Sequence, residues 1–271
     1  MKRLFFCIAM AICMAACSRP YVIVQIADAQ FGFTASDKAQ AEGRAYDNDV
    51  TYELDCLSKA VGMVNEIKPD AVVFTGDQVH HPDNQVEWTA FKDAVSNISA
   101  DVKVFHLPGN HDVFIGDRAV DMSPYEKHFG EGNFLQNDRN VTLIGLNTNY
   151  IKYDDARESE QLSWLESSLD KSNEVTLVFG HHPFFLENIE EGDGYFQIQK
   201  DKRHKYFEMF RNKGVDGVFT GHLHNNAGAE YEGVPSLTAT SVAYQIGDSK
   251  PSISVITVKD GKVSSEMIPL P

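Results

Sequence analysis

Residues 103–112 read KVFHLPGNHD, and this stretch decides how the rest of the chain is interpreted. The first five residues predict a short strand, and the Pro-Gly pair that follows predicts a turn at its end. The turn carries Asn110, His111 and Asp112, which are residue types that can bind metals or move protons. A strand that runs straight into such a loop is typical of an α/β sheet, where binding sites gather at the carboxyl ends of the strands.

Four further loops have the same form. Each directly follows a predicted strand and carries Asp, Asn or His. If these strands share one sheet edge, the five loops would bring two or three carboxylates, an amide and at least four histidines together. The four loops are Asp28-Ala29-Gln30, Gly76-Asp77, Gly180-His181-His182 and Gly221-His222-Leu223-His224, after predicted strands at 21–27, 71–75, 175–179 and 215–220.

Between the strands, apolar residues recur at helical spacing, which predicts helices that alternate with the strands. The alternation indicates an α/β fold, bordering on α+β, with a mixed or parallel sheet and outer helices. We find no repeat and no linker, so residues 18–271 are expected to form one domain. Residues 28–49 are polar and are expected to be irregular. Helices are predicted at 54–67, 86–98, 161–169 and 206–212, and further strands at 141–146, 229–231, 236–240, 253–258 and 263–267.

Composition and charge exclude several classes of protein. The chain has 271 residues, 42% of them hydrophobic, which is ordinary for a globular protein and excludes fibrous and disordered chains. The formal net charge is −15 and no basic run is present, so binding of a nucleic-acid duplex is not expected. An anionic substrate would therefore need bound metal to neutralise it.

Residues 1–17 have the features of an export signal. Lys2 and Arg3 precede a short apolar stretch, and Met14-Ala15-Ala16-Cys17 resembles a bacterial lipobox. We expect cleavage before Cys17, a lipid on that residue and a location in the bacterial periplasm or cell envelope; the alternative is an ordinary cleaved signal. Cys56 would then be the one cysteine left with a possible free thiol, which excludes a cysteine zinc site.

The residue types in the five loops suit Mn, Fe or Zn, which accept oxygen and imidazole nitrogen together. Their number exceeds what one tetrahedral ion needs, whereas two ions that share a bridging carboxylate would use them all. Taken singly, an aspartate at a strand end is usually a cap or turn former, and a buried histidine is usually a core residue. Five such loops in one chain favour the metal interpretation.

These five motifs resemble the signature of the calcineurin-like metallophosphoesterases. Gln30 in the first motif makes the chain similar to the subgroup related to purple acid phosphatases, in which Gln stands where many members have His. The resemblance implies a four-layer sandwich, in which two mixed β-sheets pack face to face and are flanked by helices. It also implies a cofactor of two divalent or trivalent metal ions.

The resemblance further implies a role for each residue. Asp77 would bridge the ions, and His111 would act as general acid or electrostatic stabiliser, oriented by Asp112. Because Gln30 is a weak ligand, His80 would either supply the missing imidazole or merely line the loop. His182 is assigned to the surroundings of the site or to packing. The first ion would be held by Asp28 and His224, and the second by Asn110, His181 and His222.

The implied reaction is hydrolysis of a phosphomonoester or phosphodiester by a hydroxide held between two metals. The substrate would be a phosphorylated small molecule or a phosphoprotein. The alternatives are a lipoprotein that binds metal or phosphate without catalysis, and a purely structural surface lipoprotein. Two polar insertions at 37–49 and 187–199 could form the rim, and five aromatic residues either stack on an aromatic substrate group or pack in the core: Phe31, Phe33, Phe184, Phe185 and Tyr195.

Overall fold

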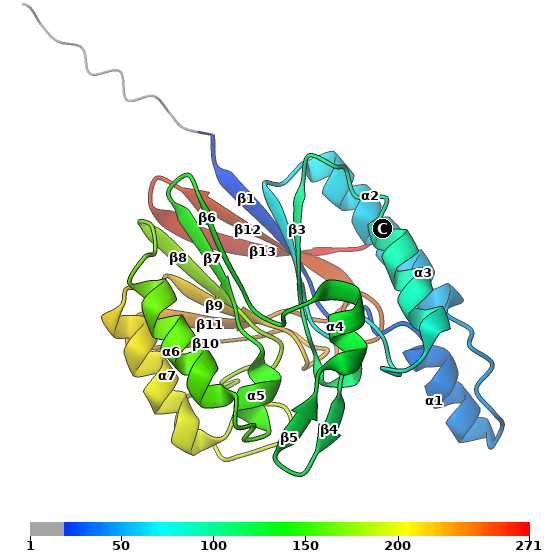
Figure 1. The fold of residues 1–271 in the computed structure, drawn as a ribbon. Helices are drawn as coiled ribbons and strands as arrows, with labels where there is room; N and C mark the ends of the chain where they lie inside the picture. The colour runs from blue at the N-terminus through cyan, green and yellow to red at the C-terminus, as the bar shows by residue number, and fades with distance from the viewer. Residues whose placement is uncertain (1–18) are drawn as a thin grey trace, which may run out of the picture.

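A computed structural model describes residues 19–271, so the predicted signal and the lipidation site Cys17 lie outside the described residues. Two mixed β-sheets pack face to face, with helices on both outer faces (Figure 1). The α/β four-layer sandwich expected from the sequence is thereby confirmed.

The first sheet has five strands, in the spatial order β13 (Lys262–Pro269), β12 (Ser252–Lys259), β1 (Tyr21–Ile26), β2 (Ala71–Thr75) and β3 (Lys103–Leu107). The second has six, in the order β10 (Ala227–Tyr231), β11 (Val234–Thr238), β9 (Gly217–Thr220), β8 (Val175–Phe179), β7 (Val141–Gly145) and β6 (Phe134–Asp138).

Successive side chains of each strand point to opposite faces of its sheet, and this alternation produces the layers. In β2, Ala71 and Val73 pack against residues of the second sheet such as Leu177, which places them between the sheets. Val72 and Phe74 point to the other face and pack against the helices. Because successive side chains of a strand point to opposite faces, a fully apolar strand serves two cores. Each buried aliphatic or aromatic side chain contributes about 1.5–3 kcal/mol to folding.

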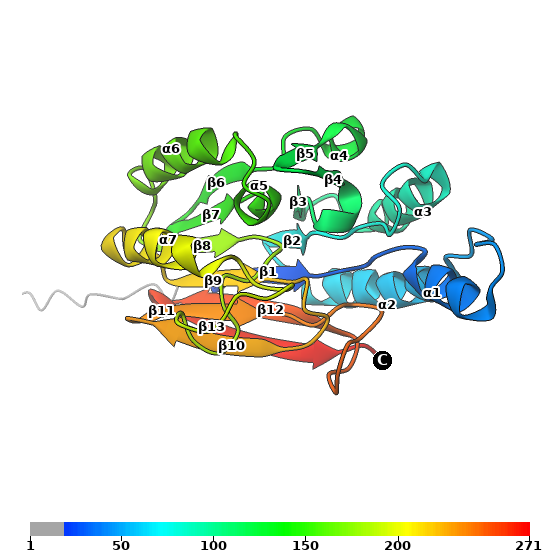
Figure 2. The same ribbon diagram turned by 90° about the horizontal axis from the view of Figure 1, so that it is seen from below.

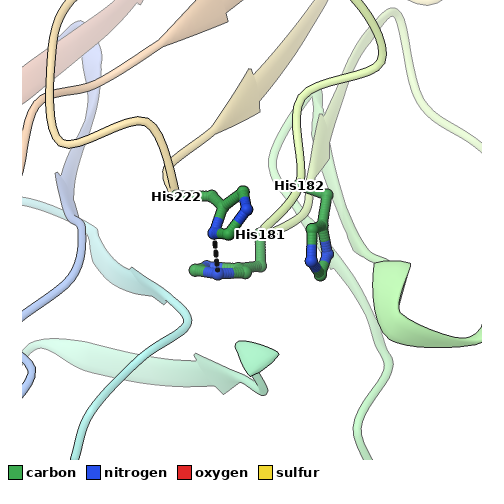
Figure 3. A group of neighbouring side chains, drawn as sticks. All are labelled: His181, His182 and His222. Atoms are coloured by element: carbon green, nitrogen blue, oxygen red, sulfur yellow. Dashed lines mark hydrogen bonds between the residues drawn. The ribbon is translucent and has the colours of Figure 1, made fainter. Parts of the chain in front are cut away.

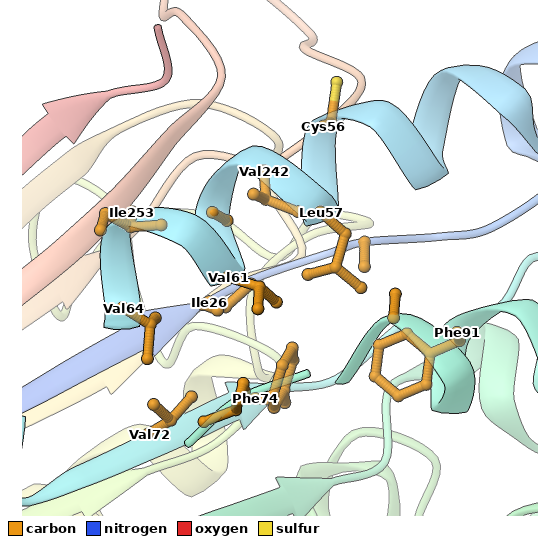
Figure 4. Packing of buried hydrophobic residues seen from close by; sticks show 14 of the residues in the cluster. Ile26, Cys56, Leu57, Val61, Val64, Val72, Phe74, Phe91, Val242 and Ile253 are labelled. Carbon is orange, nitrogen blue, oxygen red and sulfur yellow. The ribbon is translucent and has the colours of Figure 1, made fainter. Parts of the chain in front are cut away.

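Four long helices close the outer faces. Helices α2 (Thr51–Ile67) and α3 (Gln85–Val95) cover the first sheet, where Leu57 of α2 and Phe91 of α3 lie in the same cluster as Phe74 (Figure 4). Helices α6 (Glu158–Leu169) and α7 (Lys200–Asn212) cover the second sheet (Figure 2). Within the described residues, none of the helices has the length and apolar character needed to cross a membrane.

The structure differs from the sequence expectation in two regions. Residues 28–49 were expected to be irregular, yet they contain helix α1 (Phe33–Glu42), in which Ala39 is the buried residue. Residues 110–152 hold elements that the sequence did not predict: the turn η1 (Asn110–Asp112), β4 (Phe114–Gly116), β5 (Ala119–Asp121), α4 (Ser123–Phe129), the edge strand β6 and α5 (Thr148–Lys152).

The strand directions bring the five polar loops together. β1, β2 and β3 are parallel neighbours, so their carboxyl ends lie at one edge of the first sheet. β8 and β9 are parallel neighbours in the second sheet and end beside them. The nearness is direct, because the His181 ring donates across the sheets to the carbonyl oxygen of Thr75 at 2.9 Å.

Candidate metal centre

The residues that enter the site do so in an unusual backbone conformation. Asp28, Asp77, His222 and His224 have φ angles of 53°, 49°, 68° and 52°, in the left-handed region. Non-glycine residues there cost on the order of 1–3 kcal/mol each and persist where the surrounding structure enforces them. Such a concentration is typical of functional sites.

Two glycines allow the loops to approach one another. A Cβ on Gly109 would stand 2.0 Å from Asp77 Oδ1, and a Cβ on Gly76 would stand 2.4 Å from His181 Nδ1. Both distances are far below contact distance, so only glycine fits. The loops after β2, β3 and β8 therefore lie in direct contact at these glycines.

One group of polar atoms converges on His181 Nε2. Asn110 Oδ1 lies 3.0 Å from this nitrogen, His222 Nδ1 lies 3.1 Å from it, and Asp77 Oδ2 lies 3.3 Å from it. The other ring nitrogen of His181 donates to the Thr75 carbonyl, which fixes the ring. This is how proteins orient a histidine whose second nitrogen binds a metal. The structure thus brings together the set expected for the second ion.

A second group lies on the other side of Asp77. Ligand atoms of Asp28, Asp77 and His224 all lie within 4.8 Å of one another. His224 Nδ1 donates to the carbonyl oxygen of Tyr244 at 2.7 Å, which leaves its Nε2 facing Asp28 Oδ1 at 3.5 Å. Asp77 belongs to both groups, as a bridging carboxylate must.

Burial and charge set the protonation of this centre. Burial opposes the charged form of His181, but Asp77 and Asp28 outweigh it and raise the pKa of His181 to about 9. Burial also opposes the charged form of Asp77, yet His181 and His111 hold the pKa of that carboxyl well below its usual range. An ion bound at His181 Nε2 must therefore displace a proton, as metal ligands generally require.

His111 stands at the edge of this centre. Its backbone N–H donates to Asp77 Oδ1 at 2.8 Å, and its Nδ1 donates to the carbonyl oxygen of His80 at 3.1 Å. His111 is partly exposed, and among the described residues its Nε2 makes no hydrogen bond, so it can contact a bound group. These contacts suit the predicted role of His111 toward a substrate.

Asp112 connects the two loops that flank His111. Its buried carboxylate accepts hydrogen bonds from the backbone N–H groups of Gln78, Val79 and Gly109, at 2.8, 3.2 and 2.8 Å. It thereby ties the loop after β2 to the loop after β3. The hydrogen bond found at the His111 ring nitrogen is the one to the His80 carbonyl, and orientation of His111 by Asp112 stays a prediction.

Gln30 and His80 lie next to each other, outside the two groups. Gln30 is buried with φ 41°, and its amide nitrogen lies 3.4 Å from His80 Nδ1. The His80 ring stacks on His111 with centroids 4.8 Å apart, and burial together with the neighbouring His111 and His81 lowers the pKa of His80 to about 3. Ligation by either residue stays a prediction.

His182 lies beside the centre, but its hydrogen bonds disfavour metal binding (Figure 3). Thr148 Oγ1 accepts the backbone N–H groups of His181 and His182, at 3.1 and 2.9 Å, which occupies both of its lone pairs. Its own proton must then go to His182 Nδ1, 3.1 Å away. His182 Nε2 therefore carries the remaining ring proton, and neither nitrogen offers a lone pair. This agrees with its assignment to the surroundings of the site.

The residues present fit two metal ions. The donors are carboxylate and amide oxygens with imidazole nitrogens, the set that Mn, Fe and Zn accept. Within residues 19–271, Gln30 Oε1 and His222 Nε2 are buried without a hydrogen-bond partner, which polar groups in a core rarely tolerate. Bound cations would explain why so many ligand atoms crowd around Asp77.

Two supporting residues escaped the sequence analysis. Glu87, fully buried on α3, accepts the backbone N–H groups of His80 and His81 at 3.0 and 2.7 Å and so holds the segment that supports His111. Thr148 at the start of α5 fixes His182. Neither residue stands in a recognisable motif, because each acts through contacts distant in sequence.

The fold and these donors define a metal-dependent hydrolase. The family described as calcineurin-like phosphoesterase matches residues 21–226, so the chain belongs to this family and is a phosphoric ester hydrolase.

Three known proteins illustrate the similarity. The mouse (Mus musculus) "Serine/threonine-protein phosphatase CPPED1" is 28% identical over 260 residues, covering 90% of this chain and 82% of that protein. A "Probable glycerophosphodiester phosphodiesterase GpdQ" of Arcobacter nitrofigilis is 30% identical over 188 residues, covering 66% of this chain and 65% of that one. The purple acid phosphatase PPD1 of yellow lupin shares the fold, with a TM-score of 0.65 at 15% identity over 92% of this chain and 52% of its own.

Proposed function

We propose that this protein hydrolyses phosphomonoesters or phosphodiesters at a centre of two metal ions, with Mn, Fe or Zn as the native metals. The observation that carries the proposal is the position of Asp77. Its carboxylate belongs both to the group with Asp28 and His224 and to the group that converges on His181. Relatives named as a protein phosphatase and as a phosphodiesterase support the reaction class and leave both ester types open.

In this proposal Asp28, Asp77 and His224 hold the first ion, and Asp77, Asn110, His181 and His222 hold the second. Two ions so held would activate water near neutral pH and neutralise the phosphoryl oxygens. They would also explain how a chain with a net charge of −15 binds an anion.

The residues of the chain orient the metal ligands, orient His111 and supply a proton to the leaving group. The carbonyl oxygens of Thr75 and Tyr244 orient His181 and His224. The His80 carbonyl orients His111, whose Nε2 donates a proton to the departing ester oxygen. The phosphorus–oxygen bond to the leaving group breaks, and water supplies the oxygen that replaces it.

The test is restoration of turnover by metal. The purified full chain is stripped with a chelator and resupplied with Mn, Fe, Zn or Mg separately, and hydrolysis of p-nitrophenyl phosphate and bis-p-nitrophenyl phosphate is measured. Turnover that returns with metal is expected, and the faster ester indicates the preferred class. Uptake of metal without turnover of either ester would favour the alternative of a binding protein.

We also propose that the protein is exported and tethered to a membrane of the bacterial cell envelope through a lipid on Cys17. The sequence Met14-Ala15-Ala16-Cys17 after a short apolar stretch supports this. In cell fractionation we expect the wild type in the membrane fraction and Cys17→Ser outside it. Cys56→Ser is the matched control and should stay with the membranes. A Cys17→Ser variant that still sediments with membranes would contradict the tether.

A further inference from the structure

The loop between β8 and α7 (residues 180–199, the β8–α7 loop) carries an exposed aromatic side chain to the metal centre. Tyr195 is 63% exposed, although its ring centroid lies 5.2 Å from that of His222. Phe196 lies 5.5 Å from the same histidine and 5.2 Å from Tyr195. The site thus has an aromatic surface next to a residue of the second group, and most of Tyr195 is free to contact something else.

Two buried cationic side chains hydrogen bond to the backbone of the β8–α7 loop on which Tyr195 lies. Lys152, nearly buried, donates from Nζ to the carbonyl oxygens of Gly194 and Gln197 at 2.8 and 2.5 Å, on either side of the two aromatic residues. Fully buried Arg203 donates to the carbonyl of Glu191 at 2.6 Å. Buried cations are costly unless hydrogen bonded, so these contacts tie the loop to α5 and α7.

Acidic side chains of this loop accept hydrogen bonds from its own backbone and from the start of α7. Glu191 accepts the backbone N–H groups of Leu186 and Glu187 at 2.8 Å each. Asp193 accepts the N–H of Lys200 at 2.7 Å, at the start of α7. Glu190 pairs with the side chains of Lys200 and His204 on α7. These three acidic groups are therefore engaged within the loop and with α7, whereas Tyr195 presents its phenol ring beside His222.

Aromatic side chains also border the other half of the centre. The Phe33 ring lies 6.2 Å from His224 of the first group and 4.5 Å from Tyr244. Phe31, Phe184 and Phe185 are buried in the core, so packing is the correct interpretation for these three. Of the candidates from the sequence, Tyr195 and Phe33 are the ones at the site.

We propose that Tyr195 stacks on the organic group of the substrate, and that this group is an aromatic ring joined to the phosphate through one ester oxygen. Aromatic rings interact at centroid separations of about 4.5–7 Å. The ring centroids of Tyr195 and His222 lie 5.2 Å apart, so an aryl group esterified to a phosphate held next to His222 would lie beside the Tyr195 ring. The inference rests on the proposed function and names the substrate class for the same site.

The test uses binding, so it does not depend on turnover. Phenylphosphonate and methylphosphonate carry the same charged group but differ in the ring, and their P–C bonds resist hydrolysis. Calorimetric titration of the Mn²⁺-loaded full chain measures both dissociation constants. We expect tighter binding of phenylphosphonate, and in Tyr195→Ala a loss of about tenfold for this ligand with methylphosphonate within about twofold.

Two further variants separate stacking from general damage. Tyr195→Phe keeps the ring and should keep the preference, and Tyr52→Ala removes an exposed tyrosine of α2 and should change neither constant. Equal binding of both ligands by the wild type, or an equal loss of both in Tyr195→Ala, would overturn the inference while metal-restored turnover leaves the proposed function standing. Absence of binding of either ligand would also overturn it.

Discussion

Asp77→Asn is expected to lower metal-restored turnover on the order of 10⁴-fold or more. Asp77 belongs to both ligand groups, and its Oδ2 lies 3.3 Å from His181 Nε2. An amide carries no charge and cannot bridge two cations, so both ions lose a ligand. The loss of one preorganised electrostatic contact already costs about 10²–10³ in rate. The measurement is kcat with p-nitrophenyl phosphate at saturating metal, beside the metal content of the purified variant.

The control for this variant is Asp101→Asn, which changes an exposed aspartate after α3 and should leave turnover unchanged. Turnover of Asp77→Asn within about tenfold of the wild type would show that the carboxylate does not bridge the ions. Circular dichroism of both variants would exclude a trivial loss of fold.

His111→Ala is expected to retain both metals and lose about 10²–10⁴-fold in kcat. The backbone N–H of residue 111, which binds Asp77, survives the substitution, so the metal centre keeps that support. What disappears is the imidazole that the His80 carbonyl orients toward the leaving group. The loss should be smaller for p-nitrophenyl phosphate than for glycerol 2-phosphate, because a nitrophenolate needs little protonation and an alkoxide needs much.

His128→Ala is the matched control, because it removes a histidine of α4 that stacks on Trp88. It should leave both rates unchanged. A His111→Ala variant with unchanged turnover would contradict the role of His111. Loss of metal from this variant would instead assign His111 to the ligand set.

The sequence predicted the site better than the surrounding structure. The ligand groups follow strands whose apolar runs end at glycine or at a polar residue: Asp28, Asp77 and the three histidines stand directly after such runs. This pattern can be recognised in the sequence without knowing the tertiary structure. Helix α1 escaped notice because Ala39 is its buried residue, so it lacks the apolar stripe by which amphipathic helices are identified. The short elements at 110–129 pack through contacts distant in sequence. They are too short for their apolar residues to show the spacing of a helix or a strand.

The roles of individual polar groups were harder to predict than their presence. The family resemblance implied that Asp112 orients the His111 ring, and the hydrogen bonds that its carboxylate accepts come from three backbone N–H groups of two loops. The orienting atom is a backbone oxygen of His80, and a sequence motif does not display backbone contacts. The ring of His182 is hydrogen bonded by the hydroxyl of Thr148, which lies 34 residues earlier in the chain.

The presence of two ions that share Asp77 is tested most directly by anomalous diffraction from crystals of the protein grown with Mn²⁺. We predict two peaks roughly 3.5–4 Å apart with the Asp77 carboxylate between them. One peak should lie next to Asp28 and His224, and the other next to Asn110, His181 and His222. A single peak or no peak would contradict the dinuclear centre.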